Sequence, residues 1–506
     1  MGRMRKILII SIVGVISLIH GSCKNMLDLD STRLVNEDNM WTSMEDTRAA
    51  LMGVYGLTKA ALNDQNAHWI YGEVRTNEFI IPNRQDLKAV ASHNLNASFS
   101  TLESLSNWRR WFAVVNAANI FLERSIEVKN NDGRYTENNY TVDNAQVKFL
   151  RAFAYFYMVR IWGDVPLVVS SSEGSFVNKQ REDKGKVLAW AEREMLEAAQ
   201  LLPYRYSVND EQQLGNYYNE GSGRWDGSLV RKVTAYAILA HLAAWQGDYP
   251  NAASYSKFVM DNYPKASVGY ITTATLTNGN GFFNGKNINQ LFAFGSVWSH
   301  IEGYFTGYIE ELTLAAPVVN KNIPEMYMGK ESIMSVFNEI KDERFAVDTL
   351  GRPSTDVYFT NFNGRYPIFS KIKSIQGGSS DPSFRLFNSA TVLTRLEDIT
   401  LLRAESLSVL GEEFGAIEML NAVRERRGLD PYNRQTNGDL IDAIFRERQR
   451  ELMGEGHRWY DLVRFHKIKK SDKVYNNLID NDGIYWPIAE SVLAQNNKLM
   501  QNNYWK

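Results

Sequence analysis

Cysteine is almost absent from this chain of 506 residues, which has only Cys23. A single cysteine excludes an internal disulfide and a zinc site built on several thiolates. An excess of charge of one sign is also missing, because 56 Lys and Arg stand against 58 Asp and Glu, for a formal net charge of -2. Proteins that bind nucleic acid usually carry a basic face, and the charge balance gives no indication of one.

Familiar catalytic motifs are missing as well. The sequence has no His-Glu-x-x-His zinc motif and no G-x-S-x-G nucleophile elbow. Gly279, Gly281, Gly285 and Lys286 resemble a phosphate loop, but their spacing is wrong and Asn287 stands where the motif needs Ser or Thr. Carboxylates are plentiful, yet no spacing selects a glycosidase pair. We therefore expect a protein that is not an enzyme, with no catalytic residue, cofactor or metal site.

Residues 1–22 predict a lipoprotein signal peptide. Three basic residues precede an apolar stretch from Ile7 to Ile19, and two small residues stand directly before Cys23. The apolar stretch is shorter than the roughly 20 residues of a membrane-spanning helix. A sole cysteine in this position resembles a bacterial lipobox, although His20 stands where the usual pattern has Leu. We predict acylation of Cys23; the alternative is a plain secretory signal with a chance cysteine.

Helical periodicity dominates the rest of the chain. Glycine turns at 247 and 411 each join two helices, a pattern typical of tetratricopeptide-like hairpins. The repeats have diverged too far to give a clean period. We expect an all-α dominated, irregular tetratricopeptide-like helical-repeat scaffold. The main predicted helices are Met44–Leu62, Asn107–Arg124, Asp143–Ile161, Lys186–Leu202, Ser228–Trp245, Asn251–Asn262, Leu396–Leu410 and Phe414–Arg427.

One region differs from the helical pattern. Residues from about 263 to 395 are rich in Gly, Asn, Thr and aromatics, which predicts a loop-rich insertion carrying short strands. Binding surfaces are often built from such loops on a rigid scaffold. We predict a single domain over 23–506, with helical repeats at about 41–262 and 396–465 and a C-terminal element at 466–506.

Five segments, in order along the chain, resemble the SusD/RagB family. They are NWRRWFAVVNAANIFLER (107–124), VKFLRAFAYFYMVRIWGDVPLV (147–168), EDITLLRAESLSVLGEEFGAIEMLNAVRERRGL (397–429), IFRERQRELMGEGHRWYDLVRF (444–465) and YWPIAESVLAQNNKLMQNNYW (485–505). Ala489 departs from the second Pro that is usual in the last segment. The resemblance implies a lipid-anchored protein at the cell surface, on the outer membrane. It also implies delivery of a captured nutrient, usually an oligosaccharide and in some cases a peptide, to a SusC-like TonB-dependent transporter.

We interpret the charged residues of the fourth segment as scaffold. Side chains of opposite charge at helical spacing can form ion pairs that hold terminal helices against the repeats. We expect Trp459 and Tyr460 to be buried beside them. The residues of this predicted ion-pair cluster are Arg448, Glu451, Glu455, Arg458, Asp461 and Arg464.

A protein that captures sugars needs aromatic platforms beside side chains that hydrogen-bond to hydroxyl groups. Two segments offer this mixture: HWIYGEVRTNEFIIPNR at 68–84, which we expect to be a polar loop, and the insertion. Trp69 and Trp298 are the preferred stacking residues, and core packing is the alternative for every aromatic. The predicted ligand-binding residues are Trp69, Tyr71, Arg75, Asn77, Glu78, Trp298 and Tyr304.

Three other functions remain open from the sequence alone. A peptide-binding member of the same family would share every motif above. A surface glycoside hydrolase would need a specific carboxylate pair at the base of a cleft. A structural adaptor would bind partner proteins only.

The predicted lipid anchor is tested by replacing Cys23 with alanine. Without the thiol no acyl chain can be attached, so the Cys23→Ala protein should leave the membrane fraction. Cell fractionation and mass spectrometry of the N-terminus measure this. Unchanged partitioning, or an intact unacylated N-terminus in the wild type, would refute the lipoprotein interpretation.

Overall fold

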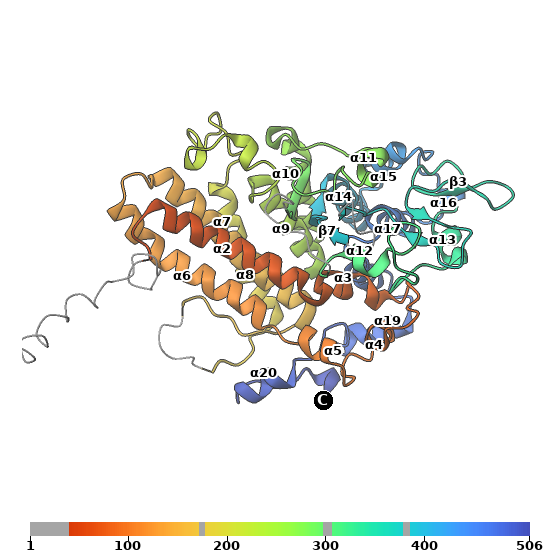
Figure 1. Ribbon diagram of the computed structural model, residues 1–506, viewed down its shortest axis with the longest axis horizontal. Helices are drawn as coiled ribbons and strands as arrows, with labels where there is room; N and C mark the ends of the chain where they lie inside the picture. The colour runs from red at the N-terminus through yellow and green to blue at the C-terminus, as the bar shows by residue number, and fades with distance from the viewer. Residues whose placement is uncertain (1–39, 172–177, 297–305, 378–384) are drawn as a thin grey trace, which may run out of the picture.

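The computed structural model describes residues 40–171, 178–296, 306–377 and 385–506, and most of them are helical (Figure 1). The longer helices are α2 (Met44–Asn63), α6 (Arg109–Asn131), α7 (Glu137–Trp162), α8 (Lys184–Leu201), α9 (Lys232–Gln246), α10 (Tyr249–Asn262), α14 (Leu396–Val409), α15 (Glu413–Arg424), α17 (Leu440–Leu452) and α18 (Arg458–Lys469). The shorter helices are α3 (Ala67–Gly72), α4 (Gln85–Ala91), α5 (Ser100–Leu105), α11 (Thr273–Thr277), α12 (Ile309–Thr313), α13 (Lys330–Val336), α16 (Arg434–Asn437), α19 (Lys473–Asp480) and α20 (Glu490–Gln495).

The long helices pack in the order of the chain. α2 packs on α6, and α6, α7, α8, α9 and α10 then each pack on the next. α10 also packs directly on α14, although more than a hundred residues separate them, and α14 packs on α15 and α17. The insertion is therefore a side branch of one continuous helical stack. This arrangement confirms the predicted irregular helical-repeat scaffold with a loop-rich insertion.

Glycine residues and a helix cap explain how the chain reverses direction between neighbouring helices. Gly247 ends α9 with a φ of 83°, a left-handed conformation that glycine adopts without steric penalty. The carboxylate of Asp248 then caps α10 by accepting a hydrogen bond from the backbone N–H of Asn251 at 3.2 Å. Gly411, with a φ of 81°, makes the equivalent turn between α14 and α15.

α7 lies at the centre of the stack and is buried on almost every side. The Tyr157 ring stacks on Trp111 of α6 with ring centres 4.6 Å apart. The Phe153 ring meets Phe292 of the insertion edge-on at 4.9 Å. Large aromatic groups in such contacts bury much apolar area, and aromatic pairs add roughly 0.5–1.5 kcal/mol each. α7 thus joins the helical stack to the insertion.

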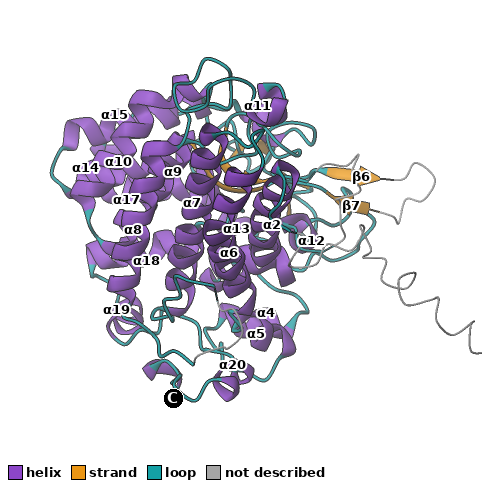
Figure 2. Ribbon diagram, turned by 90° about the vertical axis from the view of Figure 1, so that its left-hand side faces the viewer, coloured by secondary structure: helices purple, strands orange, loops and turns teal. Residues whose placement is uncertain are grey.

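The strands of the described residues all lie within the insertion and form four two-stranded antiparallel sheets. The first sheet carries the insertion back to the helical stack, with Gln290 opposite Arg395 and Ala293 opposite Val392. Figure 2 shows β6 and β7 at one edge of the molecule, away from most of the helices. The strand pairs are β1 (Gln290–Phe294) with β8 (Thr391–Arg395), β2 (Ala346–Val347) with β3 (Pro353–Thr355), β4 (Phe359–Thr360) with β5 (Ile368–Phe369), and β6 (Ile375–Gly377) with β7 (Arg385–Phe387).

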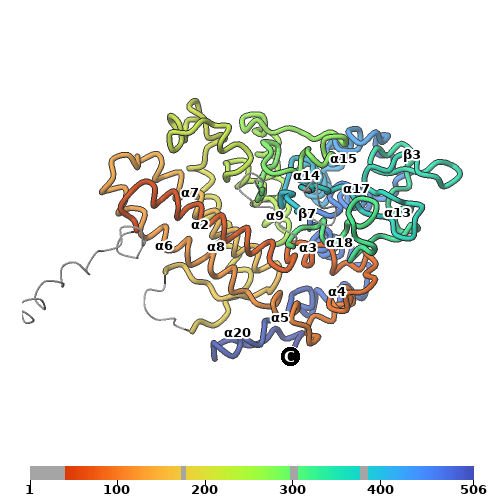
Figure 3. The backbone as a smooth tube through the Cα atoms, viewed as in Figure 1, coloured from red at the N-terminus to blue at the C-terminus, as the bar shows by residue number. Residues whose placement is uncertain are grey.

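The C-terminal segment returns to the early helices, and Figure 3 shows its blue end beside α5. The backbone N–H of Trp486 donates to the carbonyl of Ile161 at 2.6 Å, and that of Ala489 donates to the carbonyl of Ser106 at 3.0 Å. The Asn502 amide donates to the carbonyl of Trp486 at 2.7 Å. These bonds fix the last residues against the ends of α5 and α7.

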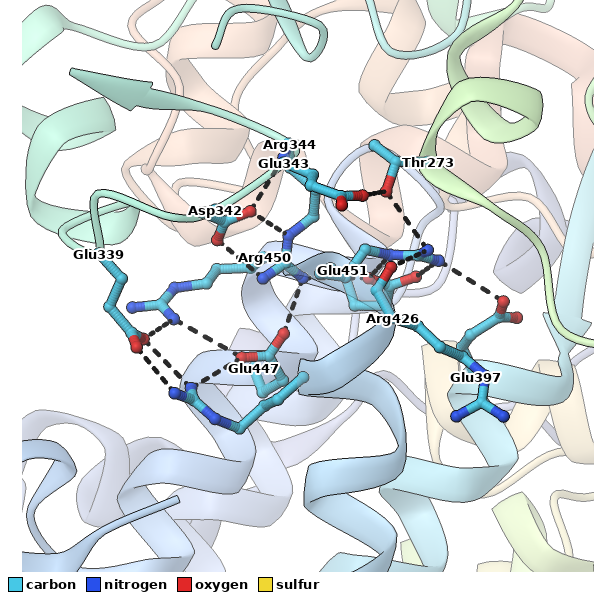
Figure 4. Close-up of polar contacts among 12 residues, drawn as sticks. Thr273, Glu339, Asp342, Glu343, Arg344, Glu397, Arg426, Glu447, Arg450 and Glu451 are labelled. Atoms are coloured by element: carbon cyan, nitrogen blue, oxygen red, sulfur yellow. Dashed lines mark hydrogen bonds and ion pairs between the residues drawn. The ribbon is translucent and has the colours of Figure 1, made fainter. Parts of the chain in front are cut away.

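A buried ion-pair network joins the insertion to the last helices (Figure 4). The Glu451 carboxylate of α17 lies 2.7 Å from a nitrogen of Arg427, 2.8 Å from Arg395 and 3.0 Å from Arg344. All four side chains are completely buried. Burial alone would raise the pKa of Glu451, but the three guanidinium groups hold it well below its usual range. Three separate parts of the chain therefore converge on one carboxylate.

A second group of pairs holds α14, α17 and α18 together. Arg448 of α17 lies 2.9 Å from Asp398 of α14 and 2.9 Å from Asp461 of α18. Arg464 contacts Asp461 at 2.8 Å and Glu405 at 2.7 Å. The sequence prediction of an ion-pair scaffold in this segment is confirmed by these contacts.

We predict that Glu451→Gln strongly destabilises the protein. The change leaves three buried guanidinium groups short of one negative charge, and breaking a buried pair in this way costs about 3–5 kcal/mol. The free energy of unfolding from urea titration measures the loss.

Asp430→Asn is the matched control, because Asp430 pairs with Lys341 at 2.8 Å while both side chains are more than half exposed. Exposed pairs contribute about 0–1 kcal/mol. Equal losses in the two variants would contradict the importance of the buried network.

Candidate ligand-binding site

Three of the residues predicted to bind ligand are buried. The Trp69 side chain is 3% exposed in α3. The Tyr71 hydroxyl donates to the carbonyl of Leu105 at 2.6 Å. The buried Arg75 guanidinium donates to the carbonyl of Gly483 at 2.6 Å and lies 4.1 Å from the centre of the Trp459 ring. Burial lowers the pKa of Arg75 to about 9. These side chains serve the core, and ligand contact by them stays a prediction that only binding measurements can test.

The expected polar loop at 68–84 is partly wrong, because residues 67–76 form α3 and a 3-10 turn, Val74–Thr76. Tertiary partners from the C-terminal segment, far away in sequence, cover this stretch. Asn77 and Glu78 follow it nearer the surface, and the Glu78 carboxylate lies 2.6 Å from Arg458. Trp298 and Tyr304 lie outside the described residues.

A polar cavity of about 600 Å³ lies between the end of α2 and the insertion, and the selected segment 68–84 contributes Ile70 and Arg84 to its lining. One wall is the end of α2 with the turn that leads into α3, and the other is α12 with Thr306 and Gly307 from the segment before it. Figure 1 shows α12 beside α3. The beginning of α6 also reaches the cavity. The lining residues are Ala60, Asn63, Asp64, Gln65, Asn66, Ile70, Arg84, Arg110, Thr306, Gly307, Glu311 and Leu312.

The turn between α2 and α3 is strained at the cavity wall. Gln65 and Asn66 have φ values of 55° and 59°, a left-handed conformation that is uncommon outside glycine. The Asn66 amide nitrogen donates to Glu311 at 2.6 Å across the cavity. Its amide oxygen is buried and accepts no hydrogen bond from the described residues. Strained residues and unsatisfied polar atoms of this kind gather at functional sites.

Charges of both signs line the cavity. Arg110 pairs with Asp64, and the Arg84 Nε donates to Asp86 at 2.8 Å. The hydrogen bond with Asp86 raises the pKa of Arg84, so this guanidinium stays charged. Guanidinium donors therefore stand beside amide and carboxylate acceptors. This set suits a neutral polar ligand with many hydroxyl groups.

The first wall is fixed by a loop between α17 and α18, residues 453–457. One ring nitrogen of His68 contacts the carbonyl of Glu455 at 3.0 Å, and the Glu73 carboxylate accepts a hydrogen bond from the backbone N–H of Gly456 at 2.7 Å. Gly456 has a φ of 79°, and a Cβ there would lie 2.3 Å from the His68 ring. Only glycine fits this approach.

The insertion is held by the same loop. The Lys371 ammonium donates to the backbone carbonyls of Glu451 and Met453, both at 2.9 Å, and pairs with the Glu455 carboxylate. Arg395 donates to the same carboxylate at 2.9 Å. Loop 453–457 thus ties together the two parts of the chain from which the cavity walls come.

Comparison with known proteins shows which family this chain belongs to. A family model described as "SusD family" matches residues 351–483, and one described as "Starch-binding associating with outer membrane" matches residues 32–213. The crystal structure of a SusD superfamily protein from Bacteroides thetaiotaomicron is 44% identical, covers 92% of this chain and 100% of that chain, and superposes with a TM-score of 0.84.

The chain belongs to the SusD family.

Other SusD-like proteins extend the similarity. SusD-like protein P38 from Formosa agariphila is 26% identical, over 95% of each chain. A SusD homolog from Bacteroides thetaiotaomicron is only 22% identical but has the same fold, with a TM-score of 0.73 over 92% of this chain and 99% of that chain. The family resemblance predicted from the five sequence segments is confirmed.

SusD family proteins bind nutrients and are not enzymes, so this chain is a SusD-like nutrient-binding protein. The description of one matching family also names association with the outer membrane. No helix in the described part of the chain is long and apolar enough to cross a bilayer. Acylation of Cys23, which lies outside the described residues, stays a prediction.

None of the predicted ligand-binding residues that the structure describes lines the polar cavity. Arg84 ends the segment that we selected, whereas Asn66 and Glu311 were missed. The only local signal is the polar run from Asn63 to Asn66 at the end of a long helix. The contact between Asn66 and Glu311 joins residues that are far apart in sequence, so no periodicity indicates it.

We predict a pH-dependent contribution to stability from Glu73. Burial raises its pKa to about 8, so the folded protein holds a proton that the unfolded chain loses near its ordinary value of 4.5. Stability from this group is therefore lost as pH rises from about 5 to 8, by at most about 1.4 kcal/mol per pH unit. Glu73→Gln keeps the hydrogen-bond acceptor for Gly456 and removes the titration. The free energies of unfolding of the two proteins should diverge over this pH range in favour of the variant, and parallel curves would contradict the prediction.

Proposed function

We propose that this SusD-like protein captures an oligosaccharide in the cavity between α2 and α12. The observation that carries the proposal is the cavity of about 600 Å³ itself, whose polar lining includes the Asn66 amide and the Glu311 carboxylate. Arg84, Arg110 and Gln65 supply further hydrogen-bond donors around the same space. The family description that includes the words "Starch-binding" supports a glycan as the ligand class.

We further propose that the protein delivers its ligand to a SusC-like TonB-dependent transporter and is anchored through Cys23 at the cell surface. Membership of the family and the words "associating with outer membrane" support both. A peptide is the alternative ligand, because the cavity presents charges of both signs. Trp298 and Tyr304 remain candidate stacking residues, since they precede the lining residue Thr306 closely in the sequence.

We predict that Arg84→Gln weakens glycan binding about tenfold or more, because a hydrogen bond from a charged donor is lost. Calorimetric titration with a panel of oligosaccharides that includes maltohexaose, together with a panel of short peptides, measures the affinity. Arg352→Gln is the matched control, since Arg352 also pairs with a nearby aspartate, Asp348, but lies outside the cavity. Trp298→Ala should also weaken binding, by roughly fivefold or more if its ring stacks on the sugar.

Three results would overturn parts of this proposal. Equal glycan affinities of Arg84→Gln and wild type would show that the glycan does not bind in this cavity. Binding of peptides in place of every glycan would change the ligand class. Release of shorter sugars during the titration would contradict a purely binding role.

The transporter partner is tested by co-purification. We expect the acylated protein to be recovered with a SusC-like barrel in mild detergent, and ligand uptake by cells to fall when its gene is deleted. Recovery as a free monomer with unchanged uptake would rule out this role.

A further inference from the structure

A second cavity, of about 650 Å³, lies on the other side of the beginning of α6. Its walls are the first half of α6, the segment that follows α7, residues 178–179, and the C-terminal segment around α20. Figure 2 shows α20 below α5, at the end of the molecule opposite α15. This volume falls within the range of small-molecule sites, which is roughly 300–1,000 Å³.

The inner surface of this second cavity is apolar. Trp108 and Phe112 form an aromatic pair with ring centres 5.8 Å apart, and both line the cavity. Val115 continues the same face of α6, and Val168 and Leu499 face the cavity from the other walls. The first cavity, in contrast, has no aromatic side chain among its described lining residues. An aromatic and aliphatic surface suits an apolar ligand body.

The rim of the second cavity is positively charged. Arg109 and Lys179 are exposed there, and none of the described lining residues is acidic. No ion pair joins Arg109 to a described carboxylate, and the Lys179 ammonium donates one long hydrogen bond, 3.4 Å to the carbonyl of Leu167. Two cations therefore remain available to a ligand.

Two glutamates contact serines that line the second cavity. Glu103 accepts a hydrogen bond from the Ser491 hydroxyl at 2.8 Å, and Glu123 accepts hydrogen bonds from the backbone N–H of Ser171, at 2.7 Å, and from its hydroxyl. Neither glutamate lines the cavity. Hydrogen bonds from serine do not cancel the charge of a carboxylate, but neither glutamate forms an ion pair with Arg109 or Lys179 among the described residues.

The walls of the second cavity are held in place by polar contacts between distant segments. The Asn496 amide donates to the backbone carbonyl of Lys179 at 2.9 Å, and the Asn107 amide donates to the Ser491 hydroxyl at 3.3 Å. These contacts hold the walls of the second cavity in place before a ligand enters. Preformed walls favour binding, because few side chains must be ordered when the ligand binds.

We propose that the second cavity binds a small amphipathic anion: an apolar, aryl or alkyl body with one carboxylate or sulfonate group. The body would lie against Trp108 and Phe112, and the anionic group would meet Arg109 and Lys179. This site is independent of glycan binding, because Arg109 and Arg110, consecutive residues of α6, line different cavities.

The test uses two matched fluorescent probes. 1-Anilinonaphthalene-8-sulfonate carries an apolar body and a negative charge, and N-phenyl-1-naphthylamine has nearly the same body without the charge. Both are titrated into the purified full chain, its Arg109→Gln/Lys179→Gln variant, and Arg110→Gln as the matched control. Asn116→Trp, which places a bulky ring at the exposed mouth of the cavity, blocks access for both probes.

We expect the double variant to bind the sulfonate probe about threefold to fivefold more weakly and the neutral probe unchanged, because exposed charge pairs contribute modestly. Arg110→Gln should leave both affinities unchanged, Asn116→Trp should weaken both, and 4-phenylbutyrate should displace the sulfonate probe. Three results would each overturn the proposal. The first is an equal effect of Arg110→Gln and the double variant on probe affinity. The others are an equal loss of affinity for the two probes in the double variant, and unchanged probe binding by Asn116→Trp.

Discussion

The buried carboxylates of Glu451 and Glu455 hold the insertion onto the helical stack. Both are buried and form ion pairs with insertion residues. Arg344 and Arg395 pair with Glu451, and Lys371 and Arg395 pair with Glu455. Removing such charges from water is unfavourable, and only a complete set of partners offsets it. The network is therefore favourable only when all its charged groups keep their positions. It fixes how the insertion lies on the helical stack and also stabilises the fold.

Loop 453–457 extends that constraint to the ligand cavity. Its backbone contacts His68 and Glu73 beside the first wall, and the carboxylate of Glu455 holds the insertion that supplies the second wall. A binding protein without catalytic chemistry depends on preorganised walls, because every side chain that must be ordered on binding weakens affinity. Gly456 allows the close approach of this loop to His68, since any side chain at position 456 would collide with the His68 ring.

The sequence predicted the scaffold better than the site, for physical reasons. Helical periodicity and turn glycines such as Gly247 and Gly411 are local, so most long helices were located within a few residues of their observed ends. The role of Glu451 and Asp461 was also predictable, because charges at helical spacing indicate ion pairs. Trp69 was misjudged as standing in a polar loop, because the C-terminal segment that helps to cover this region lies some 400 residues away. Burial by such remote partners leaves no local pattern.

Native-state hydrogen exchange under rising denaturant tests the central claim most directly, because it measures which segments open together. If the network holds the insertion and the first cavity wall to α17, peptides from 68–76, 368–377, 385–395 and 447–461 should exchange through one opening with a common free energy. Exchange of 368–377 and 385–395 at much lower denaturant, while 447–461 stays protected, would show that the insertion is held independently and would contradict the account.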